Sequence, residues 1–191
     1  MAWLDDGWPP PGLVIWGPEG CGKTYLLRIW ARRTGARVWS GSTLPDLEAV
    51  PLSGAVAVDD ADKVGDETAL LHLLNLSRER GLQLLMAARL PPSRWNVVLP
   101  DLSSRLRTLT VAEIDAPSDD LLRALLMRFA RGRQTDIPES AITWLVRRMP
   151  REARTVRRIV EQLDDASFRE QRPITWKLAA EVFGDTLETP D

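Results

Sequence analysis

A glycine-rich segment near the beginning of the chain combines residue types that can bind the phosphates of a nucleotide. It fits the pattern G-x-x-x-x-G-K-[ST] and consists of Gly17, Pro18, Glu19, Gly20, Cys21, Gly22, Lys23 and Thr24. Glycines let backbone N–H groups turn toward phosphate oxygens, and a helix that begins at the end of the segment adds a favourable dipole. In this pattern Lys23 contacts the β- and γ-phosphates and Thr24 is a ligand of Mg²⁺. The segment therefore predicts a binding site for ATP or ADP with Mg²⁺.

Two consecutive acids follow an apolar run later in the chain. Asp59 and Asp60 come directly after the four residues 55–58. Alone, an Asp pair after an apolar strand most often begins a loop or caps a helix. With the phosphate-binding pattern upstream, we expect Asp59 to hold Mg²⁺ through water and Asp60 to polarise the attacking water. Thr24 and Asp59 would then form the metal site, and Asp60 would be catalytic.

Short apolar runs and amphipathic segments alternate through the first part of the chain. An expected strand at residues 13–16 precedes the glycine-rich segment, and an expected helix at residues 24–33 follows it. Further strands are expected at residues 37–39, 55–58, 83–88 and 109–111, and a helix from Asp66 to Arg80. This alternation predicts an α/β fold with a parallel sheet between helices.

The pattern changes after Ala116-Pro117. Helices are expected at residues 118–131, 138–149, 152–169 and 175–183, and no segment in this part resembles a strand. Ser118 is suited to cap the first of these helices, and Gly132 is expected to end it. The sequence therefore predicts an α/β domain at residues 1–116 and a small all-helical subdomain at residues 117–191.

Composition excludes several classes of protein. The 25 basic and 27 acidic residues give a net charge of −2, without the basic excess that autonomous nucleic-acid binding usually needs. A single cysteine excludes an internal disulfide framework and suggests a reducing compartment, most simply the cytoplasm. With one histidine, a zinc site of the usual ligands is not expected. No apolar stretch approaches the ~18 residues of a membrane span.

The order of several motifs resembles a known family. The chain resembles the AAA+ module of the DnaA/Hda family in five segments, which occur in this order: GPEGCGKT, VAVDDAD, LPP after a strand, LSSRL and ARTVRRIVEQL. The resemblance covers nearly the whole chain and is most specific from Asp119 to Leu163. It implies a P-loop AAA+ parallel-sheet domain followed by a helical lid.

The same resemblance assigns roles to two arginines. Arg105, in LSSRL, matches the arginine finger that reaches a nucleotide held by a neighbouring protomer. Arg157, in the lid, matches sensor II, which faces the phosphates. Taken alone, an arginine is most often a solvated surface group, and Arg105 could instead pair with Asp101 or Glu113.

The chain also departs from the family pattern. Where the family has a polar sensor I after its fourth strand, this chain has Ala87-Ala88-Arg89, and we therefore expect weak intrinsic ATP hydrolysis. The family's sliding-clamp motif, which resembles Q-L-x-L-P, is not found before the first strand, so contact with the clamp stays open. DnaA's helix-turn-helix domain is also not found, and no direct DNA binding is expected.

The resemblance implies an Hda-like regulator of chromosome replication initiation. Such a protein binds adenine nucleotide and promotes hydrolysis of ATP bound to DnaA, its expected partner, through Arg105. A non-catalytic, nucleotide-switched adaptor that binds DnaA or another replication protein is the alternative. A small P-loop kinase is disfavoured, because the chain has no evident acceptor-site signature. Homodimerisation, and whether the chain is an enzyme by itself, stay open.

Overall fold

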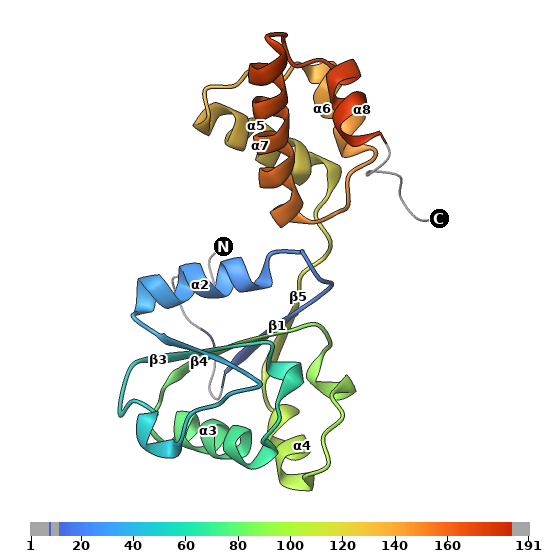
Figure 1. The fold of residues 1–191 in the computed structure, drawn as a ribbon. Coiled ribbons are helices and arrows are strands. Elements are labelled where there is room, and N and C mark those ends of the chain that lie inside the picture. Colours follow the sequence, from blue (N-terminus) through green and yellow to red (C-terminus); the bar gives the residue numbers. More distant parts are fainter. Residues whose placement is uncertain (1–7, 9–11, 185–191) are drawn as a thin grey trace. The chain divides into compact units, whose positions relative to one another are not determined.

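The computed structural model describes residue 8 and residues 12–184 (Figure 1). The chain forms two compact units. The first contains residues up to 19 together with residues 23–115, and the second contains residues 20–22 together with residues from 116 onward. The segment in which a clamp motif was sought falls largely on residues 1–7 and 9–11, which lie outside the described residues.

The first unit is built on a parallel sheet of five strands, as the alternating pattern predicted. The strands are β1 (Leu13–Trp16), β2 (Arg37–Ser40), β3 (Ala55–Asp59), β4 (Gln83–Ala88) and β5 (Thr110–Glu113), in the order β2-β3-β4-β1-β5. Val14 of β1 lies opposite Met86 of β4 and Val111 of β5. The last strand was expected at residues 109–111; instead Leu109 is buried, and its N–H bonds back to the Leu106 carbonyl, so β5 begins one residue later.

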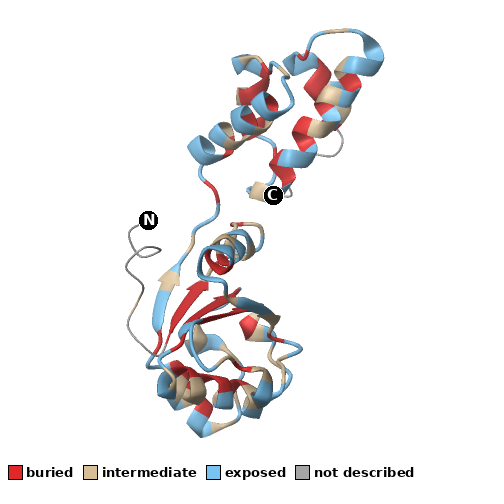
Figure 2. Cartoon of the chain, turned by 90° about the vertical axis from the view of Figure 1, so that its left-hand side faces the viewer, coloured by how far each residue is buried: buried red, intermediate tan, exposed pale blue. Residues whose placement is uncertain are grey.

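Helices cover both faces of this sheet (Figure 1). The helices are α2 (Lys23–Thr34), α3 (Glu67–Glu79) and α4 (Pro100–Leu106), with short 3₁₀ turns η1 (Leu47–Ala49), η2 (Ala61–Lys63) and η3 (Pro92–Arg94). The three central strands, β3, β4 and β1, are buried on both sides, so they read as continuous apolar runs, whereas the edge strands β2 and β5 are partly exposed (Figure 2). Alternate residues of β3 divide between the faces: Ala57 packs in the cluster with α2, and Val58 packs in the cluster with α3 and α4.

Helix ends in this unit follow local capping rules. Asp66 begins α3, because its carboxylate accepts a hydrogen bond from the Ala69 N–H at 3.0 Å. Gly81 follows the helix with φ of 62°, a conformation that favours glycine. The predicted helix from residue 66 to residue 80 is therefore confirmed to within a residue at each end. Helix α4 was not predicted, since its seven residues are too few for a clear helical pattern.

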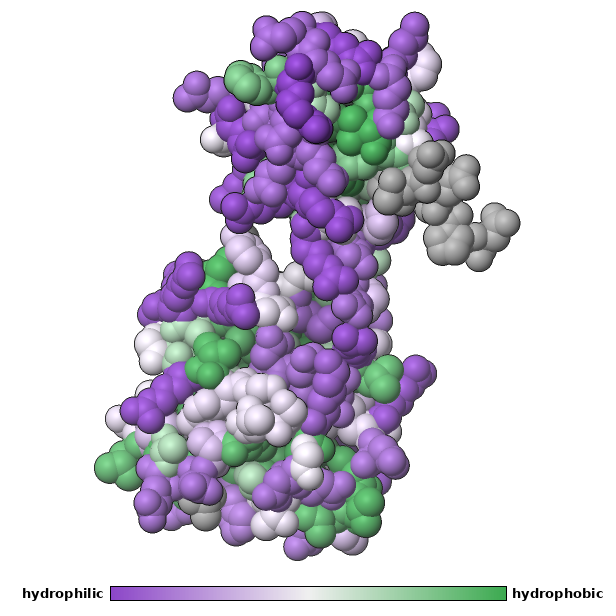
Figure 3. All heavy atoms as spheres, in the orientation of Figure 1, coloured by the Kyte–Doolittle hydropathy of each residue, from purple (hydrophilic) through white to green (hydrophobic). Residues whose placement is uncertain are grey.

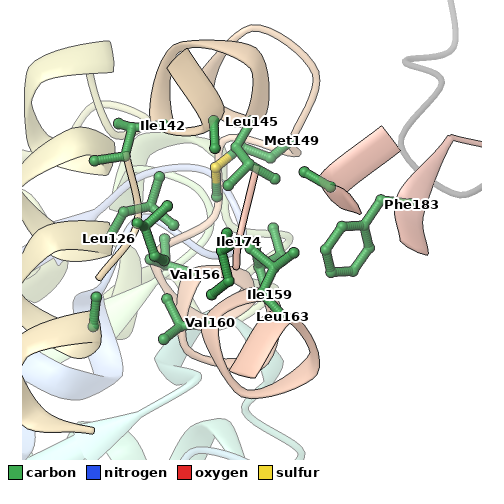
Figure 4. Close-up of a cluster of buried hydrophobic side chains, with 14 of the residues drawn as sticks. Leu126, Ile142, Leu145, Met149, Val156, Ile159, Val160, Leu163, Ile174 and Phe183 are labelled. Atoms are coloured by element: carbon green, nitrogen blue, oxygen red, sulfur yellow. The ribbon is translucent and has the colours of Figure 1, made fainter. Parts of the chain in front are cut away.

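The second unit is helical throughout its described residues. Its helices are α5 (Asp119–Gly132), α6 (Glu139–Val146), α7 (Ala153–Glu170) and α8 (Trp176–Phe183). Their apolar sides meet in one core that includes Leu126, Leu145, Val156 and Leu163 (Figure 4). On the face drawn in Figure 3, polar side chains cover most of these helices, as expected for amphipathic elements.

Two details of the second unit concern the end of α5. Gly132 was expected to end this helix, and it is the last residue of α5; the chain then turns at Gln134, with φ of 58°. Asp164 links this turn to helix α7, because its carboxylate accepts hydrogen bonds from the Thr135 hydroxyl and from Arg133 Nε. These two donors hold the pKa of the Asp164 carboxyl below its usual value.

None of the described helices combines the length and apolar character needed to cross a membrane.

Candidate nucleotide-binding site

The glycine-rich segment forms the loop between β1 and α2. Gly20 and Gly22 have φ of 79° and 104°, which side-chain-bearing residues rarely adopt. A Cβ on Gly22 would meet no atom within 4 Å, so the backbone conformation, and not crowding, requires glycine there. Helix α2 begins at Lys23, so its first N–H groups lie at the loop and have no partner within the helix. These features suit an anion-binding helix N-terminus.

The start of the loop is fastened to the sheet. Gly17 N–H donates to the Ala88 carbonyl at 3.3 Å, at the point where β4 ends. Trp16, the residue before it, lies opposite Ala88 in the pairing of β1 with β4. The loop therefore begins at the carboxyl edge of the sheet, where parallel α/β folds place ligands.

The cation of the motif lies over the loop backbone. Lys23 Nζ donates to the carbonyl oxygens of Gly17 and Pro18, at 2.8 and 2.7 Å. These contacts hold the ammonium group at the loop, where phosphate oxygens could replace the carbonyls as acceptors. Cys21, the variable position of the loop, is buried.

The structure brings the two predicted metal ligands together, although 35 residues separate them. Thr24 Oγ1 donates to Asp59 Oδ1 at 3.2 Å, and the same oxygen accepts from the Asp60 N–H at 3.1 Å. A hydroxyl and a carboxylate are hard oxygen ligands, which Mg²⁺ prefers. Among the described residues there is no group of three or more acidic, His or Cys side chains that could hold a metal. The pair therefore fits a cation that also takes phosphate oxygens and water as ligands.

Asp60 lies beside this pair in an unusual conformation. Its φ and ψ are 52° and 43°, in the left-handed region, which costs a non-glycine residue on the order of 1 kcal/mol. Gly41 permits the turn, because a Cβ there would lie 2.3 Å from the Asp60 carbonyl oxygen. The Asp60 carboxylate pairs with Lys63 Nζ at 3.0 Å, with both side chains about half exposed. The role expected for Asp60 in polarising water stays a prediction.

Sequence reasoning missed a connection between the loop and the end of β4. Arg89, the first residue after β4, pairs through its guanidinium with Glu19 Oε2 of the loop at 3.0 Å. Its N–H donates to Asp62 Oδ2 at 3.0 Å. The position of Arg89 directly after a strand was the available signal, but nothing in the sequence pairs it with Glu19 or Asp62.

Arg105 lies near the opposite edge of the sheet from the loop. It belongs to the last turn of α4, five residues before Thr110, which begins β5. Thr110 lies opposite Leu13, the first residue of β1, whereas the loop follows the last residue of β1. The half-buried Arg105 guanidinium has no hydrogen bond or ion pair within the described part of the chain. Pairing with Asp101 or Glu113 is therefore not observed.

Arg157 belongs to the second unit. It lies on α7, where its Nε pairs with Glu161 Oε1 at 2.9 Å, one helical turn further on. Its side chain is 72% exposed. The sensor role expected for Arg157 stays a prediction.

A parallel sheet in this strand order, with a phosphate-binding loop after β1 and a separate helical unit, defines a P-loop AAA+ fold with a helical lid. Domain III of the replication initiation protein DnaA from Thermotoga maritima has this fold, with a TM-score of 0.78, 17% identity, and coverage of 98% of this chain and 89% of that chain. The Thermotoga maritima RuvB Holliday junction branch migration motor matches with a TM-score of 0.74 and 20% identity over 96% of this chain and 64% of RuvB. A DNA replication initiation factor matches with a TM-score of 0.72 and 18% identity over 88% of this chain and 59% of that one.

The second unit gives a more specific similarity. Residues 119–182 match the family model described as the lid domain of Hda. The chain is thus similar to Hda in its lid region and shares the fold of DnaA domain III.

Proposed function

We propose that this chain is an Hda-like regulator of chromosome replication initiation, which binds adenine nucleotide with Mg²⁺ and promotes hydrolysis of ATP bound to DnaA. In this proposal residues 1–116 form the nucleotide-binding base domain and residues 117–191 form the lid. The Hda lid match and the AAA+ fold support the regulatory class. The observation that carries the trans-acting role is the position of Arg105, near the sheet edge opposite its own phosphate loop.

The chain has residues that would hold the phosphates and the metal of a nucleotide. Backbone N–H groups from Glu19 to Gly22 and in the first turn of α2 would donate hydrogen bonds to the phosphates. Lys23 would exchange its two carbonyl acceptors for phosphate oxygens, and Thr24 and Asp59 would hold the metal. Bound Mg²⁺-ATP supplies a phosphoanhydride bond and a cation that neutralises phosphate charge. Asp60 would orient water, and Arg157 would contact the phosphates from the lid.

Arg105 has the chemistry needed to act on a neighbour's nucleotide. Its guanidinium is always charged and can donate two parallel hydrogen bonds to phosphate oxygens, which an ammonium group cannot reproduce. An arginine supplied by a neighbouring protein is worth about 10³–10⁵ in rate in related phosphoryl-transfer systems. The half-buried side chain, without a partner in the described residues, is available for this role.

The test measures hydrolysis of labelled ATP already bound to purified DnaA, after addition of this protein. We expect Arg105→Ala to keep its melting temperature and its own nucleotide affinity, and to lose most of the stimulation. Arg105→Lys should recover little of it, because lysine lacks the planar fork. Arg107→Ala is the matched control, since Arg107 is an exposed arginine two residues away.

Full stimulation by Arg105→Ala would overturn the trans-acting role. If that variant still bound DnaA, the nucleotide-switched adaptor would become the better interpretation. Ala87 and Ala88, at the end of β4, are apolar and buried. This observation is the basis for expecting weak intrinsic hydrolysis, and it supports the adaptor for the same reason.

DnaA is the partner that this proposal requires. Cytoplasmic localisation and the absence of direct DNA binding follow from the same class of protein and from the net charge of −2. Contact with the sliding clamp and formation of a homodimer are not needed for the proposed reaction.

A further inference from the structure

We propose that Asp62 is a positioning residue for the metal site. Its carboxylate holds the turn after β3 against the end of β4, and it thereby fixes the Asp59 oxygen that faces Thr24. This inference deepens the nucleotide binding proposed above and rests on it. Asp62 would act through the backbone and through Asp59, without touching the metal or the nucleotide itself.

The end of β4 extends past the strand that pairs with it on one side. Pairing of β3 with β4 reaches Val58 opposite Met86, whereas β4 continues to Ala88. The Ala88 carbonyl faces β1, because it accepts a hydrogen bond from the N–H of Gly17, which follows β1. In a planar trans peptide the carbonyl and the next N–H point in opposite directions, so the Arg89 N–H faces the side of β3. This donor therefore lies beyond the paired part of β3 and needs another acceptor.

Asp62 supplies that acceptor from a side chain. Its Oδ2 accepts the Arg89 N–H at 3.0 Å, across 27 residues of sequence. Asp62 belongs to η2, the turn that follows Asp59-Asp60, so this hydrogen bond ties the turn to β4. The other carboxylate oxygen, Oδ1, is shielded from solvent and has no hydrogen-bond partner in the described part of the chain. Shielding a carboxylate oxygen in this way costs free energy, so a merely solvated surface role does not account for Asp62.

The turn needs such a contact because its backbone is strained. Asp60 has a left-handed conformation, which persists in proteins where the surrounding structure holds it. On the side of β2, the Gly41 N–H donates to the Asp59 carbonyl at 2.7 Å. On the side of β4, the hydrogen bond between Arg89 and Asp62 holds the other end of the turn. The predicted metal ligand Asp59 thus precedes a turn that is held from both neighbouring strands.

One further hydrogen bond connects the turn to the metal pair. The Asp60 N–H donates at 3.1 Å to Asp59 Oδ1, the same oxygen that accepts the Thr24 hydroxyl at 3.2 Å. A shift of the turn would therefore move this oxygen relative to Thr24. Lys23 is held separately, by carbonyls of its own loop. We therefore expect Asp62 to affect the metal site strongly and the phosphate contacts of the loop little.

Calorimetry of ADP binding in Mg²⁺ and in EDTA separates these two contributions. The measured quantity is the factor by which Mg²⁺ strengthens ADP binding. We expect Asp62→Ala to lower this factor roughly 10-fold, because a hydrogen bond to a charged group is lost, while ADP affinity in EDTA stays near that of the wild type. Asp62→Asn keeps an acceptor oxygen for the Arg89 N–H and should retain most of the factor. Glu48→Ala, which removes an exposed carboxylate from η1, is the control.

Hydrogen exchange of the nucleotide-free protein, followed by NMR, tests the contact itself. The Arg89 amide should exchange roughly 10-fold faster or more in Asp62→Ala than in the wild type, because its acceptor is lost. In Asp62→Asn the exchange rate should stay close to that of the wild type. Melting temperatures of all variants report folding. If Asp62→Ala does not fold, Asp62→Asn still decides, since its Mg²⁺ factor and its exchange rate are both expected to be near those of the wild type.

Each outcome decides a specific point. If the wild type binds ADP neither in Mg²⁺ nor in EDTA, the proposed nucleotide site is wrong and the role of Asp62 falls with it. If the wild type binds and Asp62→Ala keeps the full Mg²⁺ factor, only the role of Asp62 is overturned. An equal loss of ADP affinity in Mg²⁺ and in EDTA would assign Asp62 to the stability of the fold instead. A loss of the Mg²⁺ factor in Asp62→Asn would show that the charge of Asp62 matters and not its hydrogen bond, which would also overturn the proposal.

Discussion

At the scale of single residues, the chemistry proposed for the phosphate loop depends on the ammonium group of Lys23 and on the side-chain oxygens of Thr24 and Asp59. Lys23 is held by two carbonyls of its own loop, and Thr24 bonds to Asp59 across the sheet. In the proposed complex Lys23 would exchange these carbonyl acceptors for phosphate oxygens, while Thr24 and Asp59 already lie side by side. Asp60, by contrast, is engaged with Lys63, and its proposed work on water would need that exposed pair to open.

The residue-scale prediction concerns Lys23. Lys23→Ala should weaken ADP binding by roughly 100-fold or more, because it removes charge-assisted hydrogen bonds to phosphates. Calorimetry with Mg²⁺-ADP measures the change, and Arg28→Ala, an exposed cation further along α2, should bind as the wild type does. Unchanged affinity in Lys23→Ala would remove the basis for assigning this loop to nucleotide binding.

At the scale of elements, the start of helix α4 is stabilised by a side chain of α3. Helix α4 begins at Pro100, and its N-cap residue, Leu99, has no side chain that could accept a hydrogen bond. Glu67 in the first turn of α3 supplies the acceptor, since its carboxylate oxygens bond to Val98 N–H at 2.9 Å and Leu99 N–H at 2.7 Å. A residue of α3 thus caps the helix that carries Arg105.

We predict that Glu67→Ala will destabilise the first unit by about 1 kcal/mol, as loss of a capping acceptor usually does. Since α4 would no longer be held at its start, stimulation of DnaA-bound ATP hydrolysis should fall while ADP affinity stays near the wild-type value. Thermal melting and calorimetry measure the two effects. Glu79→Ala, at the exposed end of α3, serves as the control. A variant that keeps full stimulation would mean that Glu67 does not position Arg105.

At the scale of the whole molecule, the chain has its phosphate loop and its candidate finger near opposite edges of one sheet. A side chain near one edge cannot complete a site at the other, so a nucleotide bound here would need an arginine from another protomer. The proposed reaction accordingly belongs to a complex, with DnaA as the neighbour.

Slow turnover by the isolated protein follows from this arrangement. At low protein concentration we expect hydrolysis to be about 10³-fold or more below that of an assembled AAA+ site, since no finger is supplied. Release of labelled phosphate over a dilution series measures it. Rapid turnover that is independent of protein concentration would show that a complete site forms within one chain.

Local patterns in the sequence were enough for the elements that are continuous in the chain. The glycine-rich segment, the strand before it and the helix after it are contiguous, so motif and periodicity together predicted their order along the chain. The strands through β4, the four helices of the second unit and the α/β class followed in the same way. Helix α4 was missed, and two ends differ: β5 begins after Leu109, and α6 ends at Val146, three residues before the expected end at residue 149.

Contacts between distant segments were decided only by the tertiary structure. Glu19 pairs with Arg89, Asp62 accepts the Arg89 N–H, and Glu67 accepts an N–H at the start of α4. The two residues of each contact lie far apart in the sequence, so helical or strand periodicity does not relate them. Each depends on the strand order, which places β4 between β1 and β3 and thereby brings the ends of three strands together. Periodicity reports which side of an element is buried, but strand order and side-chain pairing arise from packing of the whole sheet, because many orders would bury the same apolar runs equally well.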